Sequence, residues 1–254
     1  MFFLAWTRAG LLVAVLLCFD GASCQSSKRN RGSETYQVLQ AFSQCDQLGE
    51  QTIINEHIPD LARINWDNYI QSVCAWGVWL FFEDPNYNGN TWDSARVEWV
   101  FGEGHCTNLA TEFVRGRVRS LKYVGDIEDW FRDTITFFQH KLFMGTEYYE
   151  VTDVADTRVW SRPKSLIITG DSSWSLYERV YFGGFCVCIE PMRTYRGGIA
   201  IVEDLVSATD LNGVGSFRKG CRSECDGVYR ANLEDHGRDY GQRRSRGRSG
   251  RRRS

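Results

Sequence analysis

The stretch Ile168–Trp174 is the part of the sequence that most resembles a catalytic motif, because it places Ser172 in a Gly-Asp-Ser sequence after an apolar run. A serine-protease form of that motif needs glycine where Ser173 stands. A lipase form needs an aspartate three residues before a C-terminal histidine, and Leu233 occupies that place before His236. A G-x-S-x-G elbow is also absent from the sequence. The sequence therefore predicts that the protein is not an enzyme.

Four cysteines towards the end of the chain could bind zinc or form disulfides. Cys186 and Cys188 are two residues apart and face the same side of a strand, and Cys221 and Cys225 follow the last repeat. Four thiolates can form a structural zinc site. Disulfides are the favoured interpretation if the protein is secreted, because secretion exposes thiols to oxidation.

Three cysteines precede this group, namely Cys45, Cys74 and Cys106. An odd number leaves one of them over, unless it pairs with Cys24 or with a second molecule. The alternative is a buried free thiol. All seven cysteines after Cys24 are thus disulfide candidates.

The first residues have the pattern of a secretory signal peptide. Arg8 is followed by the apolar run Leu11–Phe19 and then by small residues. We assign residues 1–24 to the signal, with cleavage after Ser23 or Cys24. No later stretch reaches the 18 or so apolar residues that a membrane-spanning helix needs, so we expect a secreted, extracellular protein without a membrane span.

Charge is distributed unevenly along the chain. Residues 25–33 carry +3 and the last twelve residues carry +7, so with a whole-chain charge of −2 the body, residues 34–242, carries −12. Such a basic end favours polyanions. Since the protein is expected outside the cell, we expect anionic glycans or acidic matrix polymers as partners, and no nucleic acid. The candidate polyanion-binding residues are Arg243, Arg244, Arg246, Arg248, Arg251, Arg252 and Arg253.

A repeated pattern organises the rest of the chain: an aromatic residue, six residues, a glycine, and later a serine that opens an apolar strand. The aromatic and glycine pairs are Phe42 and Gly49, Phe82 and Gly89, Phe138 and Gly145, and Tyr177 and Gly184. The serines are Ser72, Ser120, Ser165 and Ser216. The separations from glycine to serine are 23, 31, 20 and 32 residues, alternately short and long. Repeats one and two should therefore form one domain, and repeats three and four a second.

Each part of the repeat has a physical role in a folded-over hairpin. The glycine suits a position with positive φ, which costs glycine little. The aromatic ring seven residues earlier can lie across a turn that has no Cβ. The serine hydroxyl can bond to the turn backbone. Strands that alternate apolar and polar residues flank the turns, as expected for half-buried strands.

This pattern resembles the βγ-crystallin family. The segments WLFFEDPNYNG and WSLYERVYFGG are very similar to the openings of second motifs in lens γ-crystallins. The resemblance implies an all-β protein with two βγ-crystallin-like Greek-key β-sandwich domains. Their expected bounds are residues 34–123 and 134–222, joined by a linker at 124–133. Residues 223–254 are expected to be a disordered, arginine-rich tail.

The resemblance also raises calcium binding, because many βγ-crystallins bind calcium through paired Asn or Asp residues followed by Ser or Thr and Ser. Asp67, Asn68 and Ser72 fit this pattern, but Gln71 replaces a hydroxyl ligand. The corresponding second-repeat segment, residues 115–120, is basic and would repel a cation. We expect at most one weak calcium site and no other cofactor.

We draw three hypotheses about function from these features. The first is a non-enzymatic, secreted structural or binding protein of an extracellular matrix, coat or secretion. The second is a secreted defence, toxin-associated or protease-inhibiting effector, and the third is a weak calcium-binding module. The sequence leaves the oligomeric state open.

Overall fold

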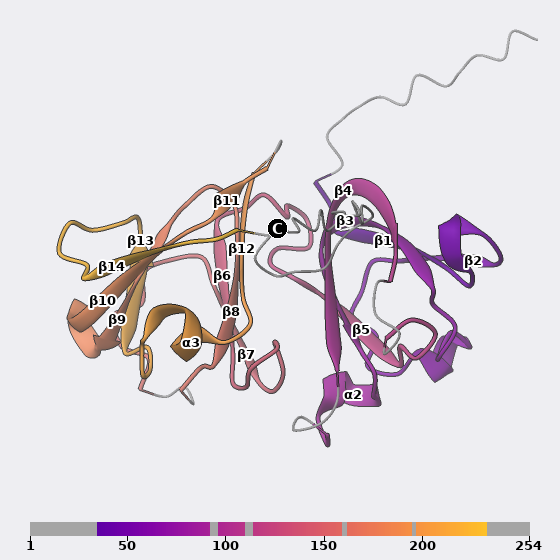
Figure 1. The fold of residues 1–254 in the computed structure, drawn as a ribbon, viewed down its shortest axis with the longest axis horizontal. Coiled ribbons are helices and arrows are strands. Elements are labelled where there is room, and N and C mark those ends of the chain that lie inside the picture. Colours follow the sequence, from indigo (N-terminus) through magenta and orange to yellow (C-terminus); the bar gives the residue numbers. More distant parts are fainter. Residues whose placement is uncertain (1–34, 92–95, 110–113, 159–161, 195–196, 233–254) are drawn as a thin grey trace, which may run out of the picture. The chain divides into compact units, whose positions relative to one another are not determined.

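The computed structural model describes residues 35–91, 96–109, 114–158, 162–194 and 197–232, which are mainly β-strands (Figure 1). The expected all-β class is confirmed. The strands are β1 (Val38–Phe42), β2 (Gln51–Ile54), β3 (Ser72–Phe82), β4 (Val97–Asn108), β5 (Ser120–Val124), β6 (Thr134–Phe138), β7 (Glu147–Glu150), β8 (Ser165–Thr169), β9 (Trp174–Arg179), β10 (Gly183–Glu190), β11 (Met192–Arg193), β12 (Gly198–Val202), β13 (Ser216–Lys219) and β14 (Gly227–Arg230). The short helices are α2 (Pro85–Asn88), α3 (Leu205–Thr209) and the 3-10 turns Cys45–Gln47, Leu61–Ile64 and Val180–Phe182. Across these described ranges, no helix is long and apolar enough to cross a membrane.

The first two repeats share one sheet with the order β2-β1-β3-β4. The first part of β3, Ser72–Trp76, pairs with β1, and its second part, Val78–Phe82, pairs with β5. Gly77, at the change of partner, has φ +90°, and a Cβ there would lie 2.5 Å from the Oε1 atom of Gln37. That oxygen accepts a hydrogen bond from the Val78 amide at 3.1 Å. Glycine at this position therefore allows one continuous strand to pair with β1 of the first repeat and with β5 of the second.

The last two repeats form two sheets, β11-β12-β8-β6-β7 and β13-β9-β10-β14. An antiparallel bridge joins Val154, after the third-repeat hairpin, to Phe217 in β13 of the fourth repeat. The first half has the matching bridge between Ile58 and Leu121. Each bridge links a segment of one repeat to the last strand of the next, which is the interlocking expected of paired Greek keys.

Several strands are buried on both faces. In β3, Trp79 and Phe81 belong to the core of the first half, whereas Leu80 and Phe82 belong to a separate apolar cluster. In β8 the same alternation divides its side chains between the second-half core and that separate cluster. The separate cluster draws on both halves: Val78, Leu80, Phe82, Val124, Phe138, Phe143, Met144, Ile167, Ile199 and Ile201. Burial on both faces explains apolar runs such as WLFF and SLII, which do not alternate with polar residues.

The expected linker, residues 124–133, is folded onto the start of the described chain. The backbone amide of Gln37 donates to Ile127 O at 2.8 Å. Its side-chain amide donates to Val124 O at 2.6 Å. Trp130 is only 1% exposed, and its ring centroid lies 5.5 Å from that of Phe101. The division into two domains at this segment stays a prediction, but the segment itself is firmly packed.

Candidate functional site

The folded hairpins are built from residues in the left-handed region that precede the repeat glycine. In the third and fourth repeats, aromatic residues adopt this conformation: Phe143 has φ 59° and Phe182 has φ 60°. Their rings meet the rings of Phe138 and Tyr177 edge-on, with centroids 5.5 and 5.7 Å apart. Gly49, Gly145 and Gly184 then have φ of 80°, 80° and 79°. The aromatic contact stabilises a backbone conformation that costs these residues energy when it is unsupported.

The expectation of positive φ at every repeat glycine is wrong for Gly89, which has φ −58°. In this repeat the left-handed residues continue to Asn88, with φ 59°. The Asn88 side chain is fully buried, accepts from the Asp84 amide at 2.8 Å and donates to Arg96 O at 3.0 Å. Asparagine tolerates this conformation better than most residues. Its side-chain oxygen also accepts the hydrogen bond that a backbone carbonyl accepts in the first and third repeats. Gly89 is thereby moved into the following turn.

The four repeat serines make one shared set of contacts. In the third repeat, for example, Ser165 Oγ accepts from the Phe143 amide at 3.0 Å and donates to His140 O at 2.7 Å. Each of the other serine hydroxyls also accepts from the amide of a left-handed residue and donates to the carbonyl oxygen of the residue three positions before that one. The amide donors are Gln47 for Ser72, Tyr87 for Ser120 and Phe182 for Ser216. The carbonyl acceptors are, in the same order, Gln44, Asp84 and Arg179. All four are fully buried. Each hydroxyl therefore ties a folded hairpin to the last strand of its repeat.

The weak calcium candidates are divided between two places. Asn68 has φ 58°, and its backbone amide donates to Val118 O at 2.8 Å, which sets it beside the basic second-repeat segment. Asp67 accepts from the Asn68 side chain at 3.2 Å. The Ser72 hydroxyl is instead engaged with its hairpin. Among the residues that the structure describes, no three His, Cys, Asp or Glu side chains gather as metal ligands would.

Ser172, from the Gly-Asp-Ser sequence, is part of a turn. Its hydroxyl donates to Asp133 Oδ2 at 2.7 Å and its amide donates to Oδ1 at 2.9 Å. Partial burial by itself raises the pKa of Asp133, but the bonds from Ser172 and the charge of Lys219 outweigh burial and lower it. The serine thus holds an ionised carboxylate, and the contact fixes the turn between β8 and β9.

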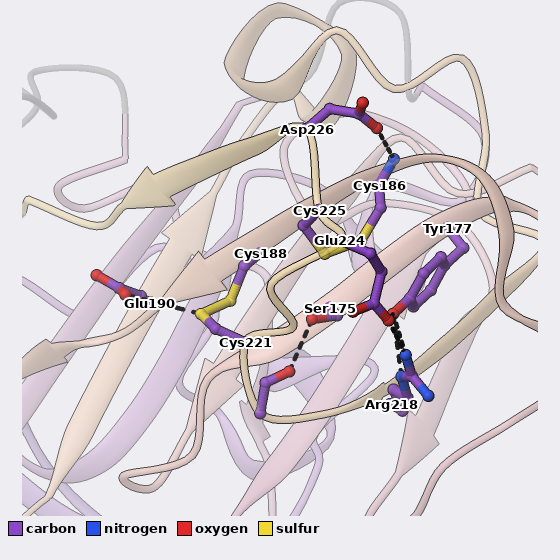
Figure 2. Close-up of a disulfide and its surroundings, with 11 residues drawn as sticks. Ser175, Tyr177, Cys186, Cys188, Glu190, Arg218, Cys221, Glu224, Cys225 and Asp226 are labelled. Atoms are coloured by element: carbon purple, nitrogen blue, oxygen red, sulfur yellow. Dashed lines mark hydrogen bonds and ion pairs between the residues drawn. A yellow bond between two sulfur atoms is a disulfide. The ribbon is translucent and has the colours of Figure 1, made fainter.

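Disulfides settle the alternatives at the C-terminal cysteines, and the disulfide interpretation is confirmed. Cys186 is bonded to Cys225, and Cys188 to Cys221 (Figure 2). In the first half, Cys74 on β3 is bonded to Cys106 on β4. Cys45 is the cysteine left over; it is partly buried, and its thiol lies 3.7 Å from Gln71 Oε1.

The expectation that the chain is disordered from residue 223 is wrong for residues 223–232. Strand β14 pairs in parallel with β10, and Cys188 lies opposite Val228. Asp226 accepts from the Cys186 amide at 2.9 Å, directly after the Cys225 disulfide (Figure 2). The sequence signal for this strand is weak, because it has only four residues and pairs with a strand some 40 residues earlier. These bonds hold the described end of the chain, up to Arg230, on β10.

Next to the disulfides, the Arg218 side chain on β13 packs against aromatic rings of the fourth repeat. Its guanidinium carbon lies 5.2 Å from the centroid of the Tyr177 ring and 5.0 Å from that of Phe182. It donates to the Tyr177 hydroxyl and forms an ion pair with Glu224 (Figure 2). Glu224 lies between Cys221 and Cys225, so this pair adds a polar contact to the disulfide-bonded loop.

The signal peptide, the basic segment 25–33 and all seven candidate polyanion-binding arginines lie outside the described residues. The described chain begins at Thr35, after the first two segments, and ends at Asn232, before the arginines.

Comparison with solved structures identifies the fold. Geodin, a βγ-crystallin from Geodia cydonium, matches with a TM-score of 0.52 and 19% identity over 73% of this chain and 99% of geodin. A βγ-crystallin from an archaeon matches 34% of this chain and 96% of its own, with 18% identity and a TM-score of 0.29. No protein-family model matches the sequence, and no curated protein matches it significantly. The match to geodin, with the hairpins, serines and interlocked sheets described above, shows that the chain has the βγ-crystallin fold.

Proposed function

We propose that the protein is a non-enzymatic, secreted structural or binding component of an extracellular matrix, coat or secretion, and that its arginine-rich tail attaches it to anionic glycans or acidic matrix polymers. The observation that carries the proposal is the loop before β14, which two disulfides bond to β10. Two covalent bonds, Cys186–Cys225 and Cys188–Cys221, lie within the residues that lead to the tail. A pull on the tail would therefore be transmitted to β10 through covalent bonds as well as hydrogen bonds.

Three disulfides within the described residues also support an oxidising, extracellular location. The hydroxyl of Ser172, from the sequence that resembles a catalytic motif, holds a turn through Asp133 instead. The charge of the body, −12 over residues 34–242, contrasts with +7 at the tail. Polyanions are repelled by the body and attracted by the tail, so contact should be directed to one end of the chain.

Heparin chromatography tests this proposal. The chain without its signal should be retained and should elute with added salt, because binding releases counterions. A chain ending at Asn232 should elute at much lower salt than the intact chain. A variant with all seven tail arginines changed to lysine is the matched control and should be retained, whereas the variant with seven glutamines should not. Equal retention of the truncated and intact chains would contradict the proposal.

A further inference from the structure

A hollow of about 460 Å³ in the second half gathers arginines in an otherwise acidic body. Its lining includes Arg158, Arg162 and Arg179, with Glu178 as the acidic residue among the described lining. The three arginines come from two separate segments, the connection between β7 and β8 and the end of β9. The loop before β13, with Asn212 and Gly213, completes the wall.

Backbone contacts hold this hollow in shape. Thr157 donates its amide to Gly215 O at 3.0 Å, and Gly215 donates to Tyr177 O at 2.7 Å. A Cβ on Gly215 would lie 2.5 Å from the backbone carbonyl carbon of Arg179, so only glycine lets these segments approach so closely. The side-chain carbons of Arg162 pass 3.7 Å from the position of a Cβ on Gly213. The loops are therefore joined before any ligand arrives.

The three arginines differ in whether their guanidinium groups form ion pairs with described carboxylates. Arg158 is neutralised by Asp156, which its guanidinium contacts through both carboxylate oxygens. Glu178 accepts from the Asn212 amide at 3.2 Å. Within the described part of the chain, neither Arg162 nor Arg179 forms an ion pair, and both side chains are exposed to solvent. Two guanidiniums with unused donors thus line one preformed hollow.

We infer that this hollow binds a tetrahedral oxyanion, a sulfate or phosphate group, through Arg162 and Arg179. A guanidinium offers a planar set of N–H donors that matches the oxygens of such anions. Two guanidiniums can share one tetrahedral anion by contacting different oxygens. The volume exceeds that of a single ion, so the anion can be free or attached to a sugar. This site uses no residue of the tail and goes beyond the proposed function.

Calorimetric titration of the full chain without its signal tests the site, with inorganic sulfate as the probe and chloride at matched ionic strength in the reference. Arg162→Gln with Arg179→Gln is the test variant. Arg63→Gln with Arg193→Gln is the control, since it removes the same charge from exposed arginines elsewhere. We expect the control to keep the saturable binding of the wild type, and the test variant to bind about a hundredfold more weakly, at about tenfold per charged hydrogen-bonding partner.

Two further titrations, with inorganic phosphate and with glucosamine 6-sulfate, distinguish the source of the anion. Tighter binding of the sulfated sugar than of sulfate would assign the hollow to a sulfated glycan, and equal binding would assign it to the free ion. Absence of saturable binding for all three probes would overturn the inference. Equal affinity of the test and control variants would overturn it as well. Neither result would bear on heparin retention by the tail, which is measured separately.

Discussion

The two disulfides that bond the loop before β14 to β10 should each contribute less to the free energy of unfolding when the other is present. Cys186–Cys225 and Cys188–Cys221 span 39 and 33 residues, and the second lies inside the first. In the loop-entropy model, either bond alone should stabilise the fold by about 4 kcal/mol. Once one is formed, the other closes only a small ring of roughly six residues and should add about 2 kcal/mol.

This nesting gives a non-additive set of variants. Replacing either pair by alanine should lower the free energy of unfolding by about 2 kcal/mol, and replacing both pairs should lower it by about 6 kcal/mol. The control is Cys74→Ala with Cys106→Ala, a bond that spans 32 residues with no partner nested around it. Its removal should cost about 4 kcal/mol in a single step.

Urea unfolding of the oxidised proteins, followed by tryptophan fluorescence, measures these differences by linear extrapolation. Equal costs of about 4 kcal/mol for each single pair, adding to twice that for the quadruple variant, would refute the nested-loop reasoning. A quadruple variant that keeps full stability would show that hydrogen bonds, and not the disulfides, hold β14.

Four other outcomes are expected. Ser165→Ala should cost about 2–3 kcal/mol in thermal unfolding, because a buried donor and a buried acceptor lose their partner, whereas Ser175→Ala, with one bond to Gly220 O, should cost about 1 kcal/mol. Burial lowers the pKa of His57 below its ordinary 6.5; stability should therefore fall as the pH drops below that value, and His57→Gln should flatten the decline. Millimolar calcium should barely move the melting temperature, because the described residues contain no gathered set of metal ligands. A micromolar site would instead raise the free energy of unfolding by about 4 kcal/mol. Limited trypsin digestion should remove the tail well before it cuts the packed segment 124–133, and early release of two halves would show that this segment opens easily.

The sequence was sufficient for the repeats because their geometry is local. A left-handed turn, a glycine and a ring seven residues earlier all belong to one short segment, and their spacing can be read directly. The serine is further along the chain, but the number of residues between glycine and serine is alternately short and long, which indicates how the repeats pair. The Gly89 exception shows the limit of this reasoning, since Asn88 can adopt positive φ and support the turn with its own side chain.

Features that depend on two distant segments were not predictable in the same way. The four residues of β14 are held by bonds to β10, some 40 residues earlier, as in the contact between Asp226 and the Cys186 amide. The pairing of the four cysteines likewise needed their positions in space. Burial of strands on both faces depends on the apolar cluster shared by the two halves, which no single repeat contains.

The same fold positions carry different charges in the two halves, and this difference decides the chemistry of each. Three residues before the serine of the first repeat in each half, the first half has Tyr69 and the second half has Arg162. Two residues after the aromatic of the second repeat in each half, the first half has Asp84 and the second half has Arg179. The first half therefore has no arginine at either of these positions, whereas the second half has two guanidiniums that form no ion pair with the described residues. Arg179→Asp, which copies the first half, should abolish sulfate binding in the calorimetric titration and leave the melting temperature nearly unchanged; retained binding would mean that the anion lies elsewhere.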